Sequence, residues 1–175
     1  MLTDGTRDVM LVSSDGKAVR FAEREVRPMG RNAHGVRGLR LGLDQQVIAL
    51  IPIDPERTVL FATEKGYGKQ TRVDEFPVHG RGGQGVIAIQ TNSRNGPVIG
   101  AAAVAAGEEI MLISDGGTLV RTPVEGVSVL GRNTQGVRLI SLGDGEKLIG
   151  MEPIADMGGG EQGDGETDES PPEEV

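Results

Sequence analysis

Short apolar runs alternate with polar, glycine-containing turns along the chain, and the whole pattern recurs at intervals of 50 and 51 residues. Three runs rich in Val, Ile, Leu and Met lead directly into a turn: residues 9–13, 59–63 and 110–114. The turns are Asp15-Gly16, Lys65-Gly66 and Asp115-Gly116. Because glycine accepts the positive φ of a tight turn, each run and the segment after its turn predict a β-hairpin.

The hairpin begins a longer repeated unit. The segments "VMLVSSDGKAVRF", "VLFATEKGYGKQT" and "IMLISDGGTLVRT" start at residues 9, 59 and 110, and the third has an extra glycine, Gly117. A glycine-arginine phrase follows in every copy, as "GRNAHGVRGL" (30–39), "GRGGQGVIAI" (80–89) and "GRNTQGVRL" (131–139). Each copy closes with an apolar run, "QVIALIPI" (46–53), "PVIGAAAV" (97–104) or "KLIGMEPI" (147–154). The chain therefore contains three tandem copies of one supersecondary unit.

Each copy has room for four short strands. The hairpin supplies two, the alternating segment that starts at the valine of the phrase supplies a third, and the closing run supplies a fourth. We therefore expect an all-β, propeller-like array of four-stranded antiparallel blades that bury their faces by stacking. With no Trp, one Tyr and three Phe, aliphatic side chains are expected to fill the interfaces. The expected domain is residues 1–157, with repeats at about 8–54, 58–105 and 109–155.

The acidic side chains are unevenly distributed. The formal net charge is −8, but residues 158–175 carry seven of the 26 acidic side chains and none of the 18 basic ones, so residues 1–157 are close to neutral. This tail has too little apolar surface to offset its ordering entropy and is expected to be disordered. The lack of cysteine, of a signal-peptide pattern and of an apolar run long enough for a bilayer favours a cytoplasmic protein without a membrane partner.

Basic residues recur at fixed positions of the repeat: after the first glycine of the phrase, after its valine, and after the hairpin turn. Regularly spaced cations on a curved rim suit duplex DNA, whose backbone phosphates are contacted without reading sequence. Because the chain has so few aromatic side chains, we do not expect it to bind single strands by stacking on their bases. The candidate DNA-binding residues are Lys17, Arg20, Arg31, Arg37, Lys65, Lys69, Arg81, Arg121, Arg132 and Arg138.

A purely structural interpretation of the phrase stays open. Its two glycines allow positive φ and close backbone approach, and its arginine then braces the blade against a carboxylate of the neighbouring blade. The middle copy has Ile87 and Gln70 where other copies have bases, so not every basic position is obligatory. Tyr67 is expected to be an exposed turn residue, and His34 and His79 ordinary loop residues. We identify no catalytic constellation, metal site or cofactor motif.

The order of these segments closely resembles the C-terminal domain of the bacterial DNA gyrase A subunit. The resemblance covers essentially residues 8–157, and "EKGYGKQT", "GTLVRT" and "GRNTQGV" are its most specific phrases. It implies a β-pinwheel, a propeller-like disc whose four-stranded blades exchange a strand with their neighbours. It also implies a non-catalytic region that wraps duplex DNA around a basic rim, within an ATP-dependent type II topoisomerase that introduces negative supercoils. The implied partners are double-stranded DNA, the rest of the gyrase A subunit, and the gyrase B subunit.

The chain departs from that family's pattern in two ways. The basic heptapeptide called the gyrase box has no clear counterpart, because "GRGGQGV" at 80–86 only echoes it. The three repeats also correspond to the last half of a pinwheel, whose two open blade faces favour self-association or strand exchange. The acidic tail is expected to compete with phosphate for the rim. The alternatives are a propeller-like protein-interaction scaffold and the related C-terminal domain of the topoisomerase IV A subunit.

Overall fold

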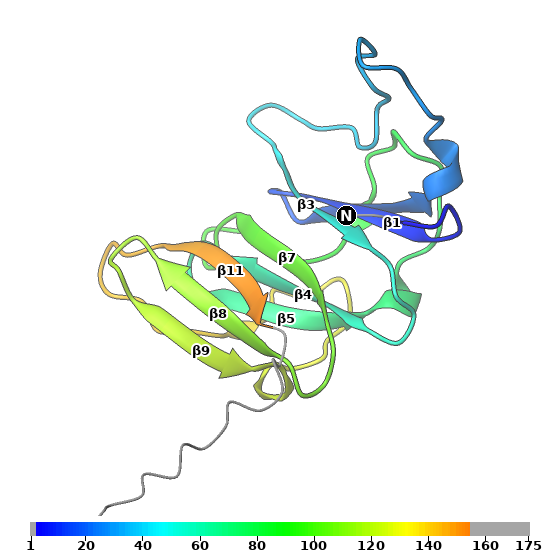
Figure 1. Ribbon diagram of the computed structural model, residues 1–175. Coiled ribbons are helices and arrows are strands. Elements are labelled where there is room, and N and C mark those ends of the chain that lie inside the picture. The colour runs from blue at the N-terminus through cyan, green and yellow to red at the C-terminus, as the bar shows by residue number, and fades with distance from the viewer. Residues whose placement is uncertain (1–2, 155–175) are drawn as a thin grey trace, which may run out of the picture.

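The computed structural model describes residues 3–154, which form three antiparallel β-sheets set side by side (Figure 1). Residues 1–2 and 155–175 lie outside the described residues, and the acidic tail expected at residues 158–175 falls among them. Within residues 3–154, no helix has the length and apolar character needed to cross a membrane. The all-β class expected from the sequence is confirmed.

Each repeat contributes a hairpin and a closing strand to one sheet. The first repeat supplies β1 (Asp8–Ser13), β2 (Lys17–Ala22) and β3 (Val47–Pro52). The second supplies β4 (Thr58–Thr63), β5 (Tyr67–Arg72) and β7 (Val98–Val104), and the third supplies β8 (Glu109–Ser114), β9 (Leu119–Pro123) and β11 (Leu148–Ile154). The first strand of every hairpin pairs with the closing strand of its own repeat, and the three predicted hairpins are confirmed.

One turn of 3-10 helix follows each hairpin and leads the chain toward the glycine-arginine phrase. These turns are η1 (Glu23–Glu25), η2 (Val73–Glu75) and η3 (Val124–Gly126). The phrases of the second and third copies end in two-residue strands, β6 (Val86–Ile87) and β10 (Val137–Arg138). β6 pairs with β2 of the first sheet, and β10 pairs with β5 of the second. The fourth strand of the first and second sheets therefore comes from the following repeat, as the family resemblance implied, and the third sheet has three strands within residues 3–154.

The third strand expected in the first copy is absent. Residues 26–46 contain no strand in the structure, and much of this segment projects away from the sheets as a long loop (Figure 1). The sequence is close to that of the third copy, so the difference lies in the surroundings. In the described part of the chain no earlier sheet offers an edge with which the first phrase could pair. Leu39 is the exception within this loop, because it is buried against Val9, Val19 and Phe21.

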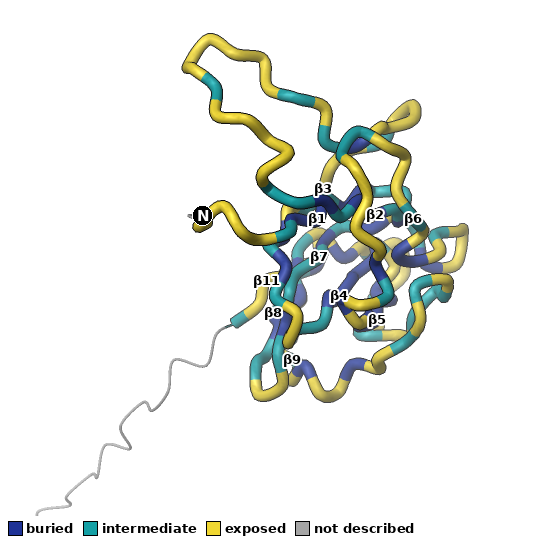
Figure 2. Tube along the Cα trace, turned by 90° about the vertical axis from the view of Figure 1, so that its right-hand side faces the viewer, coloured by how far each residue is buried: buried dark blue, intermediate teal, exposed yellow. Residues whose placement is uncertain are grey.

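The middle sheet is buried on both faces. Alternation along β4 directs Val59 and Phe61 toward the first sheet, and Leu60 and Ala62 toward the third. Figure 2 shows the strands dark at the centre and the exposed loops around them. In the first interface Phe61 packs against Phe76 with ring centroids 6.1 Å apart. The buried core of the second interface consists of aliphatic residues and methionine, as expected.

Candidate nucleic-acid interface

Each hairpin turn of the first two sheets is covered by the glycine-arginine phrase of the next repeat. The backbone N–H of Ala88 donates to the carbonyl oxygen of Gly16 at 2.8 Å, and that of Leu139 donates to the carbonyl oxygen of Gly66 at 2.8 Å. A side chain at Gly16 would collide with the carbonyl oxygen of Ile89, and one at Gly66 would lie 2.7 Å from the carbonyl oxygen of Ile140, directly after the third phrase. The hairpin turn and the phrase therefore form one layer at the edge of each sheet.

Neighbouring phrases also bond to one another. The N–H of Gly82 donates to the carbonyl oxygen of Gly38 at 2.5 Å, linking the second phrase to the first. The N–H of Gln90, the residue directly after the second phrase, donates to the carbonyl oxygen of Thr134 in the third phrase at 2.9 Å. The three phrases at 30–39, 80–89 and 131–139, with the hairpin turns that they cover, thus form a continuous surface, here called the basic rim.

The two glycines of the phrase have different roles. The second glycine has positive φ in every copy, at Gly35, Gly85 and Gly136. A Cβ on Gly136 would lie 2.5 Å from the carbonyl oxygen of Gly68, whereas one on Gly35 would meet nothing within 4 Å. The first glycine does not have positive φ in any copy. Of the two glycines that allow positive φ, only the second therefore adopts it.

The arginine of the phrase braces it against the preceding phrase. Arg81 Nη1 donates to the carbonyl oxygen of Arg37 at 3.1 Å, and Arg132 Nη1 donates to the carbonyl oxygen of Ile87 at 2.9 Å. Both arginines are only partly exposed. The structural interpretation of these arginines thus has direct support, although their acceptors are backbone carbonyls rather than the carboxylates that the sequence suggested.

Carboxylates hold the backbone of the phrase instead. Glu25 Oε2 accepts the N–H of Arg81 at 3.2 Å, and Glu75 Oε2 accepts the N–H of Arg132 at 2.9 Å. Both glutamates are the last residue of a 3-10 turn, where the third copy has Gly126. The first two sheets therefore carry an acidic receptor for the next phrase, and the third lacks it.

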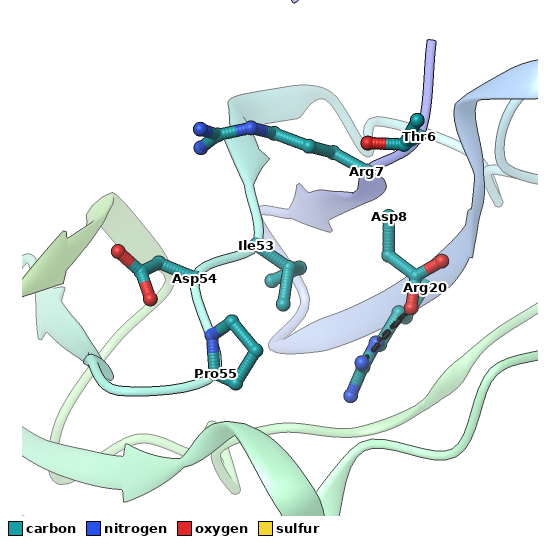
Figure 3. A pocket seen from close by; sticks show the side chains of 7 residues that line it. All are labelled: Thr6, Arg7, Asp8, Arg20, Ile53, Asp54 and Pro55. Atoms are coloured by element: carbon teal, nitrogen blue, oxygen red, sulfur yellow. Dashed lines mark hydrogen bonds and ion pairs between the residues drawn. The ribbon is translucent and has the colours of Figure 1, made fainter. Parts of the chain in front are cut away.

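Arg20 also makes an inter-repeat contact. Its guanidinium pairs with Asp8 at 2.9 Å (Figure 3), and its Nη1 donates to the carbonyl oxygen of Val73 at 3.0 Å. Gln70 is its counterpart in the second copy, because Gln70 Nε2 donates to the carbonyl oxygen of Val124 at 2.7 Å. Each side chain thus anchors the 3-10 turn of the following repeat. The glutamine in the middle copy, although it is not a base, makes the same kind of structural contact.

The sequence pattern groups Lys69 with Arg20 and Arg121 as the basic position after the hairpin turn. Lys69 is not equivalent to Arg20, however, because Gln70 is the counterpart of Arg20. Because it precedes Gln70, Lys69 lies on the opposite face of β5, where it is fully buried. Its Nζ donates to the carbonyl oxygens of Gly131 and Arg132 at 2.5 and 2.6 Å and to Thr134 Oγ1 at 3.1 Å. Burial lowers the pKa of Lys69 to about 8. The ammonium group holds the third phrase and is not presented on the surface.

The other candidates lie nearer the solvent. Arg31, Arg37, Lys65, Arg121 and Arg138 are exposed, and Lys17 is partly exposed. Lys17 pairs with Asp15 at 3.0 Å. Arg121 on β9 pairs with Glu109 on β8, outside the rim. Within residues 3–154 the guanidinium groups of Arg31 and Arg37 have no hydrogen-bond or ion-pair partner.

Tyr67 is buried, which contradicts its expected exposure. It retains 8% of its accessible surface because two arginines cover its ring, with guanidinium carbons 5.2 Å (Arg94) and 5.5 Å (Arg138) from the centroid. Hydrogen bonds from Arg138 and Arg94 lower the pKa of Tyr67 to about 8. Arg94 is absent from the candidates that the sequence suggests. Its only sequence signal is a charge reversal, since the first copy has Asp44 at the corresponding turn.

Repeated sheets, joined by exchanged edge strands and carrying one continuous basic rim, define a β-pinwheel of the propeller-like class. The chain belongs to the DNA gyrase C-terminal domain, beta-propeller, family, which matches residues 7–54, 57–105 and 108–155. The resemblance and the fold expected from the sequence are therefore confirmed.

The relatives agree with this assignment. The chain is 56% identical over 163 residues to the DNA gyrase A subunit of Pseudomonas aeruginosa, covering 93% of this chain and 18% of that protein. It is 48% identical over 155 residues to the DNA gyrase A subunit of Escherichia coli, covering 89% of this chain and 18% of that protein. The chain thus spans 18% of the length of both relatives.

Solved structures give the same fold. The structure of a DNA gyrase A C-terminal domain superposes with a TM-score of 0.80 at 25% identity, covering 87% of this chain and 52% of the other. The C-terminal domain of a DNA topoisomerase IV superposes with a TM-score of 0.82 at 22% identity, covering 88% of this chain and 48% of the other. The second likeness shows the fold alone.

Proposed function

We propose that the chain binds the phosphate backbone of duplex DNA along the basic rim and bends the duplex, as a non-catalytic DNA-wrapping part of a DNA gyrase A subunit. The observation that carries the proposal is the continuity of the rim. Its phrases are hydrogen-bonded to one another, and exposed cations stand on the first and third of them. A curved series of phosphate contacts offsets the cost of bending DNA, which is on the order of several kcal/mol.

The residues proposed to contact DNA are fewer than the sequence suggested. Buried Lys69 is left out, and so is Arg121, which lies on β9 outside the rim and pairs with Glu109. Arg20, Arg81 and Arg132 serve first as braces between repeats. The remaining rim candidates are Lys17, Arg31, Arg37, Lys65 and Arg138.

A salt titration tests the proposal. Binding of a fluorescent duplex, followed by anisotropy, is expected to weaken with salt, and the logarithmic slope falls by about one for each phosphate contact removed. Arg31→Gln with Arg37→Gln should lower the slope by about two and weaken unrelated duplexes equally. Arg72→Gln is the matched control, because Arg72 is exposed but already pairs with Asp74 at 2.8 Å. No binding at low salt, or binding indifferent to salt, favours the protein-interaction scaffold instead.

Wrapping needs a separate measurement. Sealing a nicked circular plasmid in the presence of the chain should trap a change in linking number if the duplex is wrapped. Binding without such a change would leave a DNA-binding function but contradict wrapping by this chain.

The acidic tail supplies a further element of the proposal. Residues 158–175 carry seven acidic side chains, and we propose that they compete with DNA for the rim and that the competition fades as salt screens it. Deleting residues 158–175 should then raise duplex affinity at low salt and have little effect at high salt. Equal affinity of the two proteins at low salt would contradict the role. The partners proposed beyond DNA are the rest of the gyrase A subunit and the gyrase B subunit.

A further inference from the structure

The second sheet brings two arginines together on one tyrosine. Arg138 arrives on the exchanged strand β10, Arg94 lies in the turn before β7, and Tyr67 starts β5. Arg138 Nη2 donates to Tyr67 Oη at 3.1 Å, and Arg94 Nε donates to the same oxygen at 3.5 Å. The three residues line one open cavity of about 400 Å³ beside the rim. Strands from two repeats are therefore needed to assemble the cluster.

The two guanidinium groups lack a counter-charge. Neither forms an ion pair within residues 3–154. The carboxylates that line the same cavity are engaged elsewhere, because Glu64 pairs with Lys147 at 3.0 Å and Glu146 accepts the N–H of Gly143 at 2.7 Å. Like charges held close together repel, and an anion between them would remove that cost.

The donors of the cluster remain largely unused. A guanidinium has five N–H donors, and within the described residues the side chain of each arginine makes one hydrogen bond, to the tyrosine. Planar guanidinium groups match the oxygens of a phosphate group, and contact with an aromatic ring fixes their orientation. Lys65 lines the same cavity and is exposed. The chemistry therefore fits a phosphate group better than a neutral ligand.

We propose that Arg94 and Arg138, oriented by Tyr67, form a clamp for one phosphate group of the DNA backbone, an inference that rests on the proposed function. Within residues 3–154 the clamp belongs to the second sheet alone, because the third sheet has no exchanged strand there. In the first sheet Lys17 replaces Tyr67, Ile87 replaces Arg138 and Asp44 replaces Arg94, so one basic and one acidic side chain stand where the second sheet has two arginines. The duplex is thus held at a defined point of the rim in addition to its distributed contacts.

Tyr67 makes the clamp sensitive to pH. The neutral phenol accepts hydrogen bonds from both arginines, whereas the phenolate adds a negative charge between them and opposes phosphate. Because the pKa of Tyr67 is lowered to about 8, affinity should fall as pH rises through that value. The charged groups around the phenol are Arg94, Arg138 and Lys65 together with the ion-paired Glu64 and Lys147 and the engaged Glu146. Bound phosphate should in turn raise the pKa of Tyr67 toward its ordinary value.

Duplex binding by single variants tests the clamp. Arg94→Gln should weaken binding about tenfold and lower the salt slope by about one, while Arg72→Gln should leave both unchanged. If the unmodified chain binds no duplex, the proposed function and the clamp both fail. If it binds but Arg94→Gln behaves like Arg72→Gln, only the clamp is overturned.

The pH arm has its own control. The unmodified chain should lose affinity between pH 7 and pH 9, and Tyr67→Phe should lose less, since the ring is kept and only the ionising hydroxyl is removed. Lys69 also titrates near pH 8, but it is present in both proteins and cancels in the comparison. Parallel pH profiles would overturn the role of Tyr67.

A direct measurement uses the fact that the chain has one tyrosine. NMR of an isotope label at the ring Cζ reports the ionisation of Tyr67 alone. Adding a short duplex should raise the pKa of Tyr67, and an unchanged value would overturn the proposal. Inorganic phosphate at an equal concentration of phosphate groups should give a smaller increase. An equal increase would overturn the assignment to the DNA backbone in favour of a free phosphate group.

Discussion

Lys69 shows how one buried charge secures the rim at the residue scale. Its three hydrogen bonds satisfy two backbone carbonyls and a hydroxyl of the third phrase. A buried acceptor that loses its donor costs about 1–3 kcal/mol. We therefore predict that Lys69→Met lowers the free energy of unfolding by about 2 kcal/mol in urea denaturation. Lys65→Met, at an exposed lysine whose Nζ donates only to the exposed carbonyl oxygen of Ser93, should change it by less than about 0.5 kcal/mol. Equal effects would contradict the anchoring role.

The same lysine predicts a pH dependence. Its folded pKa of about 8 lies below the unfolded value of about 10.4, so the unfolded state binds more protons between these values. Stability contributed by this position should therefore rise with pH across that window. The unfolding free energy of the unmodified chain minus that of Lys69→Met is predicted to increase from pH 7 to pH 10. A difference that stays flat, or decreases, would show that the ammonium is not disfavoured in the folded state.

Arg20 and Gln70 show that two different side chains can do one task. Both donate to the 3-10 turn of the next repeat, although only Arg20 adds an ion pair, with Asp8. We predict that Arg20→Gln costs about 1 kcal/mol, because a glutamine keeps the hydrogen bond to the 3-10 turn, as Gln70 does, and loses only the partly buried ion pair with Asp8. Arg20→Leu should cost about 2 kcal/mol, since the carbonyls of η2 lose their donor. Thermal or urea denaturation of both variants would decide, and equal losses would contradict the assignment.

At the scale of elements, the phrase works as a connector whose second glycine fits against the preceding sheet. A Cβ at Gly136 would lie 2.5 Å from the carbonyl oxygen of Gly68, while Gly35 has the same positive φ and open surroundings. Gly35→Ala should lower the free energy of unfolding by about 1–2 kcal/mol, the cost of holding an alanine in the left-handed backbone conformation. We predict that Gly136→Ala costs at least about 1 kcal/mol more, because β10 must move off β5. Equal destabilisation in urea would mean that the close approach does not matter.

The hairpins and the blade stacking could be predicted from the sequence, because apolar alternation and turn glycines are local signals. The partner of each exchanged strand could not be derived from the residues alone. The first phrase has nearly the sequence of the third, yet only the third forms a strand, since pairing depends on whether a neighbouring edge is present. The repeat pattern groups Lys69 with Arg20 because both are basic residues shortly after a hairpin turn. Lys69 is one residue short of the position equivalent to Arg20, and a shift of one residue along a strand places the side chain on the opposite face of the sheet.

The candidate site could be predicted in outline only. The recurrent arginines indicated where the rim lies. Arg81 and Arg132 donate hydrogen bonds to a preceding phrase, whereas Arg31 has no preceding phrase to contact, and this difference depends on tertiary structure. Arg94 escapes the sequence pattern because it occurs once, and a search for repeated positions discards a residue that its repeats do not share. The turn position of Tyr67 predicts exposure, but it carries no information on the two arginines that cover the ring.

At the scale of the whole molecule, the two ends of the array are unequal and complementary. Leu119 on the edge of β9 is 62% exposed, and no strand in residues 3–154 pairs with that edge. Val137 lies opposite Gly68 in the second sheet. Leu119 is the counterpart of Gly68 in the third repeat, and Val36 is the counterpart of Val137 in the first, so Val36 of a second copy would lie opposite Leu119. We predict concentration-dependent, head-to-tail association in sedimentation velocity, weakened by Leu119→Lys. Leu43→Lys, at a 96% exposed loop residue, is the control, and a monomer at every concentration would contradict the prediction.

The exchange of strands also orders the events of synthesis in time. β2 ends at Ala22, but the strand that covers its edge begins at Val86, so a ribosome must finish most of the second repeat before the first sheet can close. At ordinary translation rates that delay is on the order of several seconds. During it the nascent chain exposes an unpaired edge, and the second sheet repeats the wait between Arg72 and Val137. A ribosome that stalls within one repeat therefore leaves the preceding blade, already translated in full, without its last strand.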